Sequence, residues 1–108
     1  GTGTLYKDWM EPRALACVLG ARARTVPVSS IKALLGHPFG AAGALEAAAC
    51  LLSIRDGIVP PTANFEEPDP GCDIDCVPNR ARPVPVRAAL SLSAGFGGQN
   101  AALVLSGW

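Results

Sequence analysis

The sequence has 108 residues, and its nine basic and nine acidic side chains leave no formal net charge. This length suits one small domain or a piece of a larger one, and the charge balance excludes the basic footprint of a nucleic-acid-binding protein. No apolar run approaches the roughly 18–20 residues of a membrane span, and no signal peptide is recognisable, so we expect a cytoplasmic protein. The chain begins with a glycine inside a motif, which favours a fragment over a complete gene product.

The first predicted helix lies near the start of the chain. Pro12 suits its first helical position, or its first turn after a cap at Asp8, and Gly20 suits its end. Residues 25–29 are typical of a short strand, which Pro27 places at an edge or an end of a sheet.

The second predicted helix runs from about residue 40 to residue 56 and ends at Gly57. It is apolar nearly all the way round, and a helix without a polar face is expected to be buried. Its alanines and Gly43 would let other backbones approach closely. Apolar residues make up 49% of so short a chain, so we also expect part of this surface to face something outside these residues.

Two strands are predicted near the C-terminus. Residues 87–93 alternate as a strand does, and residues 101–105 form a continuous apolar run that suits a central strand. A glycine-rich link over residues 94–100 joins them. Together with the helices, this order indicates one α/β layered unit that covers residues 1–108, with no division into two domains.

The four cysteines do not form a recognisable metal site. Cys17 and Cys50 fall in apolar helical patterns, where a buried thiol behaves as a small hydrophobe. Cys72 and Cys76 form a single C-x3-C without a second pair, which disfavours zinc. We expect reduced structural thiols, no bound metal and no bound cofactor.

Three ionisable residues stand in small or apolar surroundings. His37 is the only histidine, Lys32 precedes it by five residues, and Glu46 follows it by nine. A neutral imidazole held in a water-poor site can donate a hydrogen bond to a developing oxyanion. Lys32 would orient it or would be an ordinary solvated lysine. Glu46, which is costly to bury unpaired, is expected to pair with Lys32, in a structural role or a chemical one.

A phenylalanine lies among glycines in the link between the two C-terminal strands. Phe96 is flanked by Gly95 and Gly97, followed by Gly98. Two interpretations stay open: Phe96 is a core plug on a tight loop, or it is a movable aromatic gate with the glycines as hinges.

Several motifs in one order resemble the C-terminal quarter of a β-ketoacyl synthase of the fatty-acid elongation or type II polyketide kind. This family comprises the condensing enzymes of fatty acid and polyketide assembly. The matching motifs are Gly1-Thr2-Gly3-Thr4 with Asp8 and Glu11, Ser29-Ser30-x-Lys32, Gly36-His37, Gly40-Ala-Ala-Gly43, Glu46, Pro60-Pro61-Thr62, Pro68-Asp69-Pro70, Val77-Pro78-Asn79, Gly95-Phe-Gly-Gly98 and Asn100.

The resemblance implies a thiolase-like layered sandwich, of which this chain would supply much of the C-terminal half of the duplicated α/β/α/β/α fold. In the family, a cysteine accepts an acyl group from the phosphopantetheine arm of acyl carrier protein. Malonyl-carrier protein then loses carbon dioxide, and its enolate attacks the acyl-enzyme. Implied partners are acyl carrier protein, acyl and malonyl thioesters, the N-terminal half of the synthase, and a second subunit in a homodimer or heterodimer.

The resemblance also implies roles for single residues. His37 matches the second of two histidines that stabilise the enolate oxygen, Lys32 the lysine that supports it, and Glu46 a glutamate of the same network. The substrate-binding matches are Thr2 and Thr4, which would hydrogen-bond the pantetheine arm, and the gating Phe96 with Gly95 and Gly97.

Some positions depart from the family pattern. The first histidine would lie immediately before Gly1, and none of the four cysteines stands in the nucleophile motif, which belongs to the N-terminal half. Lys7 stands where asparagine is usual, and Ala94 where phenylalanine is frequent. We therefore expect the chain alone to be inactive and the full-length parent to be an acyltransferase. The alternatives are a non-catalytic partner like a chain-length factor, and a structural or binding module without chemistry.

Overall fold

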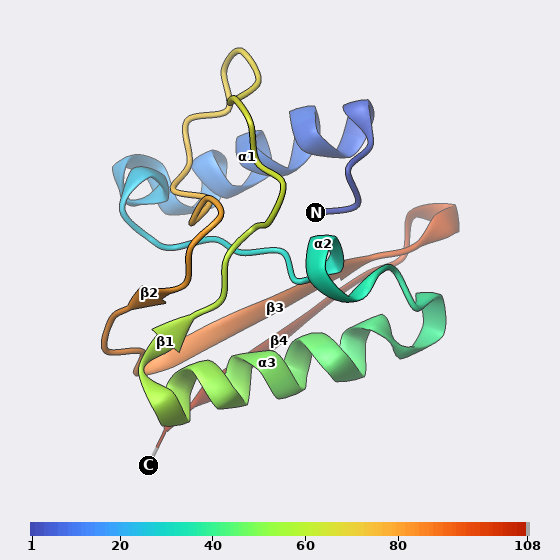
Figure 1. Ribbon diagram of the computed structural model, residues 1–108. Coiled ribbons are helices and arrows are strands. Elements are labelled where there is room, and N and C mark those ends of the chain that lie inside the picture. Colours follow the sequence, from blue (N-terminus) through green and yellow to red (C-terminus); the bar gives the residue numbers. More distant parts are fainter. Residues whose placement is uncertain (108) are drawn as a thin grey trace. The chain divides into compact units, whose positions relative to one another are not determined.

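The computed structural model describes residues 1–107, which form two compact units. Unit 1 combines Gly1–His37 with Pro60–Arg82, and unit 2 combines Pro38–Val59 with the segment from Pro83 onward. Each unit is therefore built from two stretches that are separated in the sequence (Figure 1). The expectation of a single domain over residues 1–108 stays a prediction.

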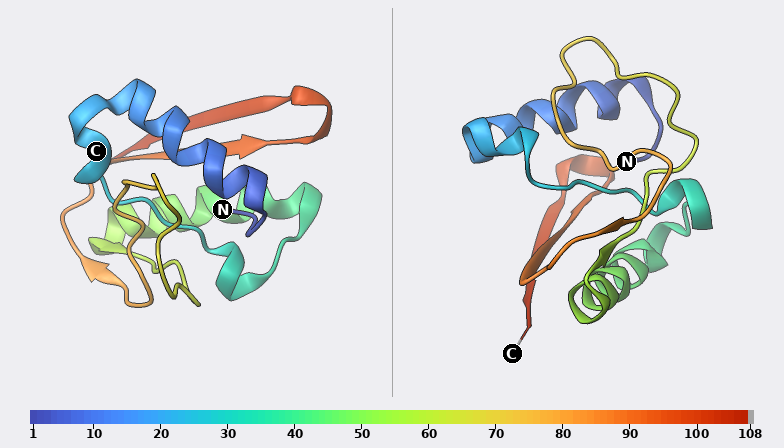
Figure 2. Two further views of the ribbon diagram at one scale, coloured as in Figure 1. Left: turned by 90° about the horizontal axis from the view of Figure 1, so that it is seen from above. Right: turned by 60° about the vertical axis from the view of Figure 1, so that its left-hand side comes forward.

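The main helix of unit 1 is α1 (Leu5–Leu19), which continues into the 3₁₀ helix η1 (Gly20–Arg24; Figures 1 and 2). A single further turn, α2, spans Lys32–Leu35. The sequence placed the end of the first helix correctly at Gly20, whose φ of 58° suits a residue without a side chain.

The predicted start of this helix was wrong. Pro12 lies inside α1 rather than in its first turn, and it is buried. Leucine, lysine, methionine and glutamate before the proline favour helix, so the turns that precede it form in spite of it. Pro12 then removes one backbone hydrogen bond from the helix instead of opening it.

Loops complete unit 1 and form its small core. The predicted strand at residues 25–29 is reduced to one parallel bridge between Pro27 and Asp75, with the N–H of Val28 donating to the Asp75 carbonyl at 2.7 Å. The side chains of Val77 and Ala23 are almost fully buried, with 1% and 2% exposure. Unit 1 is therefore held mainly by turns and loops around one helix.

Unit 2 places one helix on a β-hairpin. After the 3₁₀ turn η2 (Phe39–Ala41), α3 (Ala42–Asp56) packs on the antiparallel strands β3 (Ala88–Ala94) and β4 (Asn100–Ser106). The two strands lie side by side along their whole length in every view and are linked by η3 (Phe96–Gly98; Figures 1 and 2). Both strands and the link lie within about one residue of their predicted positions.

The C-terminal end of α3 is also where the sequence predicted it. Gly57 has a φ of 64° in the left-handed region, and its N–H donates to the Ser53 carbonyl at 3.0 Å. The two-residue strands β1 (Ile58–Val59) and β2 (Arg82–Pro83) follow in the chain. Within unit 2 the N–H of Val84 donates to the Gly57 carbonyl at 2.9 Å, which fastens the end of the helix.

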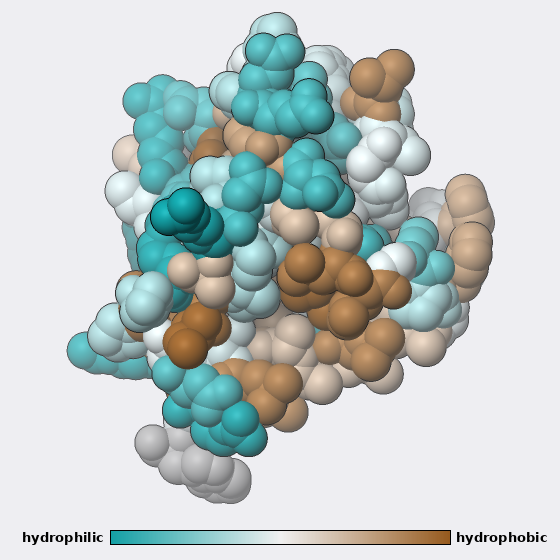
Figure 3. Space-filling view, viewed as in Figure 1, coloured by the Kyte–Doolittle hydropathy of each residue, from teal (hydrophilic) through white to brown (hydrophobic). Residues whose placement is uncertain are grey.

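The expected burial of α3 on all sides is wrong for the described residues. Leu45, Leu51 and Leu52 are 43%, 53% and 48% exposed, and Figure 3 shows hydrophobic surface over this helix. The sequence predicted β4 to be a central strand, but its Val104 is 72% exposed. The hairpin covers only one side of α3, and β4 pairs only with β3 in this part of the chain. The exposed apolar side chains agree with the high apolar fraction of the sequence.

Candidate functional site

The loop before α1 presents two threonine side chains to solvent. Thr2 Oγ1 and Thr4 Oγ1 lie 3.1 Å apart at hydrogen-bond distance, and both residues are exposed. Gly3 between them has a φ of 68°, which favours glycine. The Thr4 carbonyl accepts the N–H of Asp8 at 2.9 Å, so the loop leads directly into the first turn of α1.

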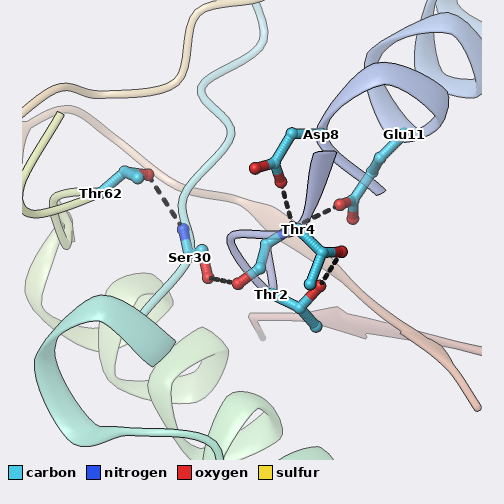
Figure 4. A network of polar contacts seen from close by, with 7 residues as sticks. Thr2, Thr4, Asp8, Glu11, Ser30 and Thr62 are labelled. Carbon is cyan, nitrogen blue, oxygen red and sulfur yellow. Dashed lines mark hydrogen bonds and ion pairs between the residues drawn. The ribbon is translucent and has the colours of Figure 1, made fainter. Parts of the chain in front are cut away.

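Ser30 connects this loop to the rest of unit 1 (Figure 4). Its Oγ donates to the Gly1 carbonyl at 2.9 Å, and its backbone N–H donates to Thr62 Oγ1 at 3.1 Å. A Cβ added to Gly1 would lie 2.7 Å from Ser30 Oγ, so a side chain at this position would displace the Ser30 hydroxyl.

A cavity of about 480 Å³ lies within unit 1. Gly1, Gly3, Ser30 and Thr62 are among its lining residues, together with Ser29. The Ser29 Oγ is buried and has no hydrogen-bond partner among residues 1–107. The loop with the two threonines thus borders a cavity that is large enough for part of a small ligand.

Lys32 and His37 lie at the two ends of the α2 turn and its cap. Lys32 is the first residue of α2, and its carbonyl accepts the N–H of Gly36 at 2.8 Å. Gly36 has a φ of 80°, which ends the turn and directs the chain to His37. His37 is exposed, so these residues alone do not supply the water-poor setting that we expected around it. Its catalytic role stays a prediction.

Glu46 belongs to unit 2, where it lies in α3 and is half-buried. Its Oε2 accepts a hydrogen bond from Ser93 Oγ of β3 at 3.5 Å. The predicted pairing with Lys32 of unit 1 stays a prediction. Glu46 also contributes, after burial, to raising the pKa of the Cys50 thiol.

The predicted gate residue lies at the tip of the β3–β4 hairpin. Phe96 is 96% exposed, so the interpretation of a core plug is wrong for the described residues. Gly97 and Gly98 both have a φ of 79°, and the N–H of Gly95 donates to the Gln99 carbonyl at 2.8 Å. The loop is closed at its base and presents the aromatic ring at its tip.

The four cysteines are free thiols. Cys17, which lies in α1, is exposed, which corrects the expectation that it is buried. Burial raises the pKa of Cys72 and of Cys76. No group of three metal-ligating side chains occurs in residues 1–107, and none of their helices is long and apolar enough to cross a membrane.

Sequence comparison gives the family. The profile of the beta-ketoacyl synthase C-terminal domain matches residues 1–66, more than half of the chain. The chain belongs to this family. The resemblance that the motif order indicated is thereby confirmed.

Relatives of the β-ketoacyl synthase family match nearly the whole chain. It is 55% identical over 106 residues to the tetracenomycin polyketide synthase ketoacyl synthase alpha subunit of Streptomyces glaucescens, covering 98% of this chain and 25% of that protein. It is 50% identical over 106 residues to 3-oxoacyl-[acyl-carrier-protein] synthase 2 of Coxiella burnetii, covering 98% and 26%. The chain thus spans about a quarter of the length of these relatives.

Solved ketosynthase structures have the same fold. One of them is the structure of a type II polyketide synthase acyl-carrier protein in complex with its ketosynthase, bound to the hexaketide. It matches with a TM-score of 0.94 at 40% identity, and the match covers 98% of this chain and 26% of the chain in that structure. The ishigamide ketosynthase/chain length factor matches with a TM-score of 0.94 at 44% identity, over 100% and 26%. The fold is therefore the thiolase-like α/β fold of the ketosynthases, as predicted.

Sequence reasoning missed two polar residues of the site. Ser30 and Thr62 entered only as parts of motifs, although they connect the threonine loop to the frame of unit 1. They are 32 residues apart in the sequence, and no local periodicity links them. The paired serines in a chain segment that also carries Lys32 were the only available signal.

Proposed function

We propose that this chain is the C-terminal part of a condensing enzyme that joins an acyl thioester to malonyl-acyl carrier protein. The supporting observation is that it matches a ketosynthase, itself in complex with an acyl-carrier protein, with a TM-score of 0.94 at 40% identity. In the reaction, the acyl group on an enzyme cysteine is attacked by the enolate left when the malonyl carboxylate departs as carbon dioxide. A carbon–carbon bond forms, the acyl–sulfur bond breaks, and the cysteine sulfur takes up a proton.

His37 is proposed to stabilise the oxyanion of that enolate. An imidazole N–H aimed at the thioester oxygen lowers the energy of the charge that develops there, most strongly when water is excluded. Lys32, five residues earlier, would orient the imidazole, and Glu46 would complete the network. Because His37 is exposed in this quarter-length chain, the remaining part of the enzyme would have to enclose it.

Thr2 and Thr4 are proposed to hydrogen-bond the phosphopantetheine arm. Their hydroxyls are exposed, lie 3.1 Å apart, and can each donate and accept. Phe96 would act as the gate of the acyl pocket, with Gly95 and Gly97 as hinges. The enzyme needs no bound cofactor in this proposal, because the arm is carried by the acyl carrier protein.

The chain alone is proposed to be inactive. The nucleophilic cysteine and the first histidine would come from the N-terminal part of the synthase, and the thiols of Cys50, Cys72 and Cys76 have raised pKa values that disfavour the reactive thiolate. The proposed partners are this N-terminal part, acyl carrier protein, and a second subunit.

The test uses the intact synthase that carries this chain. Acylation of a cysteine by acyl-carrier protein, or its labelling by a cerulenin-like electrophile, is expected. His37→Ala should abolish release of carbon dioxide from malonyl-carrier protein while acyl loading continues. The surface variant Thr25→Ala is the control. Unimpaired decarboxylation in His37→Ala would refute the role of this residue.

A second candidate is a non-catalytic subunit similar to a chain-length factor. It is favoured by the match to the ishigamide ketosynthase/chain length factor structure, at 44% identity. The presence of both Lys32 and His37 supports the catalytic candidate instead. Absence of any acylated or electrophile-labelled cysteine in the intact protein would favour the second candidate.

A further inference from the structure

We propose that Ser30 and Thr62 are positioning residues that hold the Gly1–Thr4 loop in the geometry needed to bind the phosphopantetheine arm. This inference rests on the proposed function and extends it to two residues that do not themselves touch the substrate. They act through the Gly1 carbonyl and the Ser30 backbone (Figure 4).

Thr62 is the fixed end of this connection. Its N–H donates to the Val77 carbonyl at 2.9 Å, and its own carbonyl accepts the N–H of Asn79 at 3.0 Å. Val77 is 1% exposed and forms the best-buried point of unit 1. Thr62 therefore belongs to a rigid part of the unit, and its Oγ1 accepts the Ser30 N–H from there.

The Gly1–Thr4 loop is the other end of this connection. All four of its residues are exposed, and an exposed loop of small residues has little packing of its own to define its shape. The hydrogen bond from Ser30 Oγ to the Gly1 carbonyl reaches the loop from a segment 29 residues away. Because a Cβ on Gly1 would lie 2.7 Å from this Oγ, the contact also fixes how closely the two segments approach.

Ser30 also borders the segment with the predicted catalytic residues. It lies two residues before Lys32, in the backbone that leads into α2. One residue thus sets the position of the threonine loop relative to the start of α2, within unit 1. Loss of this connection should weaken binding of the arm more than it slows the chemical step, since neither hydroxyl faces the reacting atoms in this proposal.

The experiment measures KM and kcat of the intact synthase for two malonyl thioesters. One is malonyl-carrier protein, and the other is the S-ethyl thioester of malonate, which lacks the amide groups of the arm. Thr62→Val removes, at nearly constant shape, the Oγ1 that accepts the Ser30 N–H. Ser30→Ala removes the Oγ that donates to the Gly1 carbonyl. Both should raise KM for malonyl-carrier protein about fivefold to tenfold, as expected for one lost hydrogen bond, with kcat nearly unchanged. KM for the ethyl thioester should not change.

Three further variants separate positioning from general damage. Thr62→Ser keeps the hydroxyl and should retain the KM of the unmodified synthase. Thr25→Val, the same substitution at an exposed threonine of unit 1 whose Oγ1 donates to the Arg22 carbonyl at 3.2 Å, should change neither substrate's KM. Gly1→Ala, which forces Ser30 Oγ away, should reproduce the effect of Ser30→Ala.

The inference is overturned if Thr62→Val and Ser30→Ala leave both KM values unchanged, or if both substrates are affected equally. That failure differs from failure of the proposed function, in which the unmodified synthase itself releases no carbon dioxide from either thioester. The second result would remove both proposals, and the first would remove only the positioning roles.

Discussion

The guanidinium of Arg82 donates two hydrogen bonds to the carboxylate of Asp75, from Nη2 to Oδ1 at 2.8 Å and from Nη1 to Oδ2. The Asp75 side chain is 19% exposed, and its backbone carbonyl accepts the N–H of Val28 at 2.7 Å. One residue therefore joins three segments of unit 1. The hydrogen bonds from Arg82, more than any other contact, lower the pKa of the Asp75 carboxyl.

The lowered pKa predicts how the stability of the chain depends on pH. The unfolded carboxyl titrates near pH 3.9, so the stabilisation by ionised Asp75 is fully present above that value and is lost as pH falls through the lower folded pKa. Asp75→Asn should reduce the free energy of unfolding by about 1 kcal/mol at pH 7, allowing for solvent screening, and should flatten its decline in acid. Urea unfolding at a series of pH values from about 7 down to about 2.5 measures both effects.

Asp73 offers a matched control for this prediction. It forms an ion pair with Arg24, but the two side chains are 61% and 71% exposed. An exposed pair contributes little, so Asp73→Asn should change the free energy of unfolding by less than about 0.5 kcal/mol. Equal effects of Asp73→Asn and Asp75→Asn would contradict the importance of the bidentate pair.

Gly43 in the first turn of α3 and Gly57 at its C-terminal cap should respond to alanine in opposite directions. Gly57 has a φ of 64°, where a side chain is strained, so Gly57→Ala should destabilise the chain by about 1 kcal/mol. Gly43 lies inside the helix, and an added Cβ would meet only Ser93 Oγ, at 3.7 Å. Gly43→Ala should therefore stabilise the chain by about 0.5–1 kcal/mol. Thermal unfolding of both variants checks the signs; destabilisation by Gly43→Ala would indicate that another backbone approaches this point.

Local signals in the sequence were sufficient for much of the fold. Gly57 ends α3 because a left-handed cap needs no partner beyond the helix itself, and β3 and β4 follow from alternation and a glycine-rich link. The start of α1 was predicted wrongly from Pro12, because proline only prefers helix starts. The residues before Pro12 favour helix strongly enough for the helix to continue through it. The burial of α3 was harder to predict. An apolar sequence indicates that a helix packs against other elements, but it does not indicate which elements these are.

The candidate site was predictable only through the order of its motifs. The catalytic roles proposed for His37, Lys32 and Glu46 depend on the resemblance, because no periodicity or spacing alone separates these residues from ordinary structural ones. Ser30 and Thr62 could not be found in this way, because their contact depends on two loops of unit 1 that meet only in the folded chain.

The thiols should react in an order set by exposure. Cys17 is exposed on α1, whereas burial raises the pKa of Cys50, Cys72 and Cys76 and keeps their thiolate fraction small at neutral pH. Iodoacetamide at pH 7.5, roughly one unit below an ordinary thiol pKa, should therefore label Cys17 first. Peptide mapping against time measures the order. Cys17→Ser should remove the fast phase and leave the slow phases unchanged.

Phe96 should be important for acyl transfer and unimportant for stability. Its ring is 96% exposed at the tip of the hairpin, so Phe96→Ala removes almost no buried surface and should change the free energy of unfolding by less than about 0.5 kcal/mol. If the ring gates the acyl pocket, the same variant should slow acyl loading of the intact synthase at least about tenfold, which corresponds to about 1.4 kcal/mol in the barrier. Single-turnover acylation from acyl-carrier protein, with thermal unfolding in parallel, separates the two effects.

Val104→Ala, on β4 of the same hairpin but outside the loop, should leave acyl loading unchanged. Normal loading together with a clear loss of stability in Phe96→Ala would instead mean that the intact enzyme buries this ring as a packing residue.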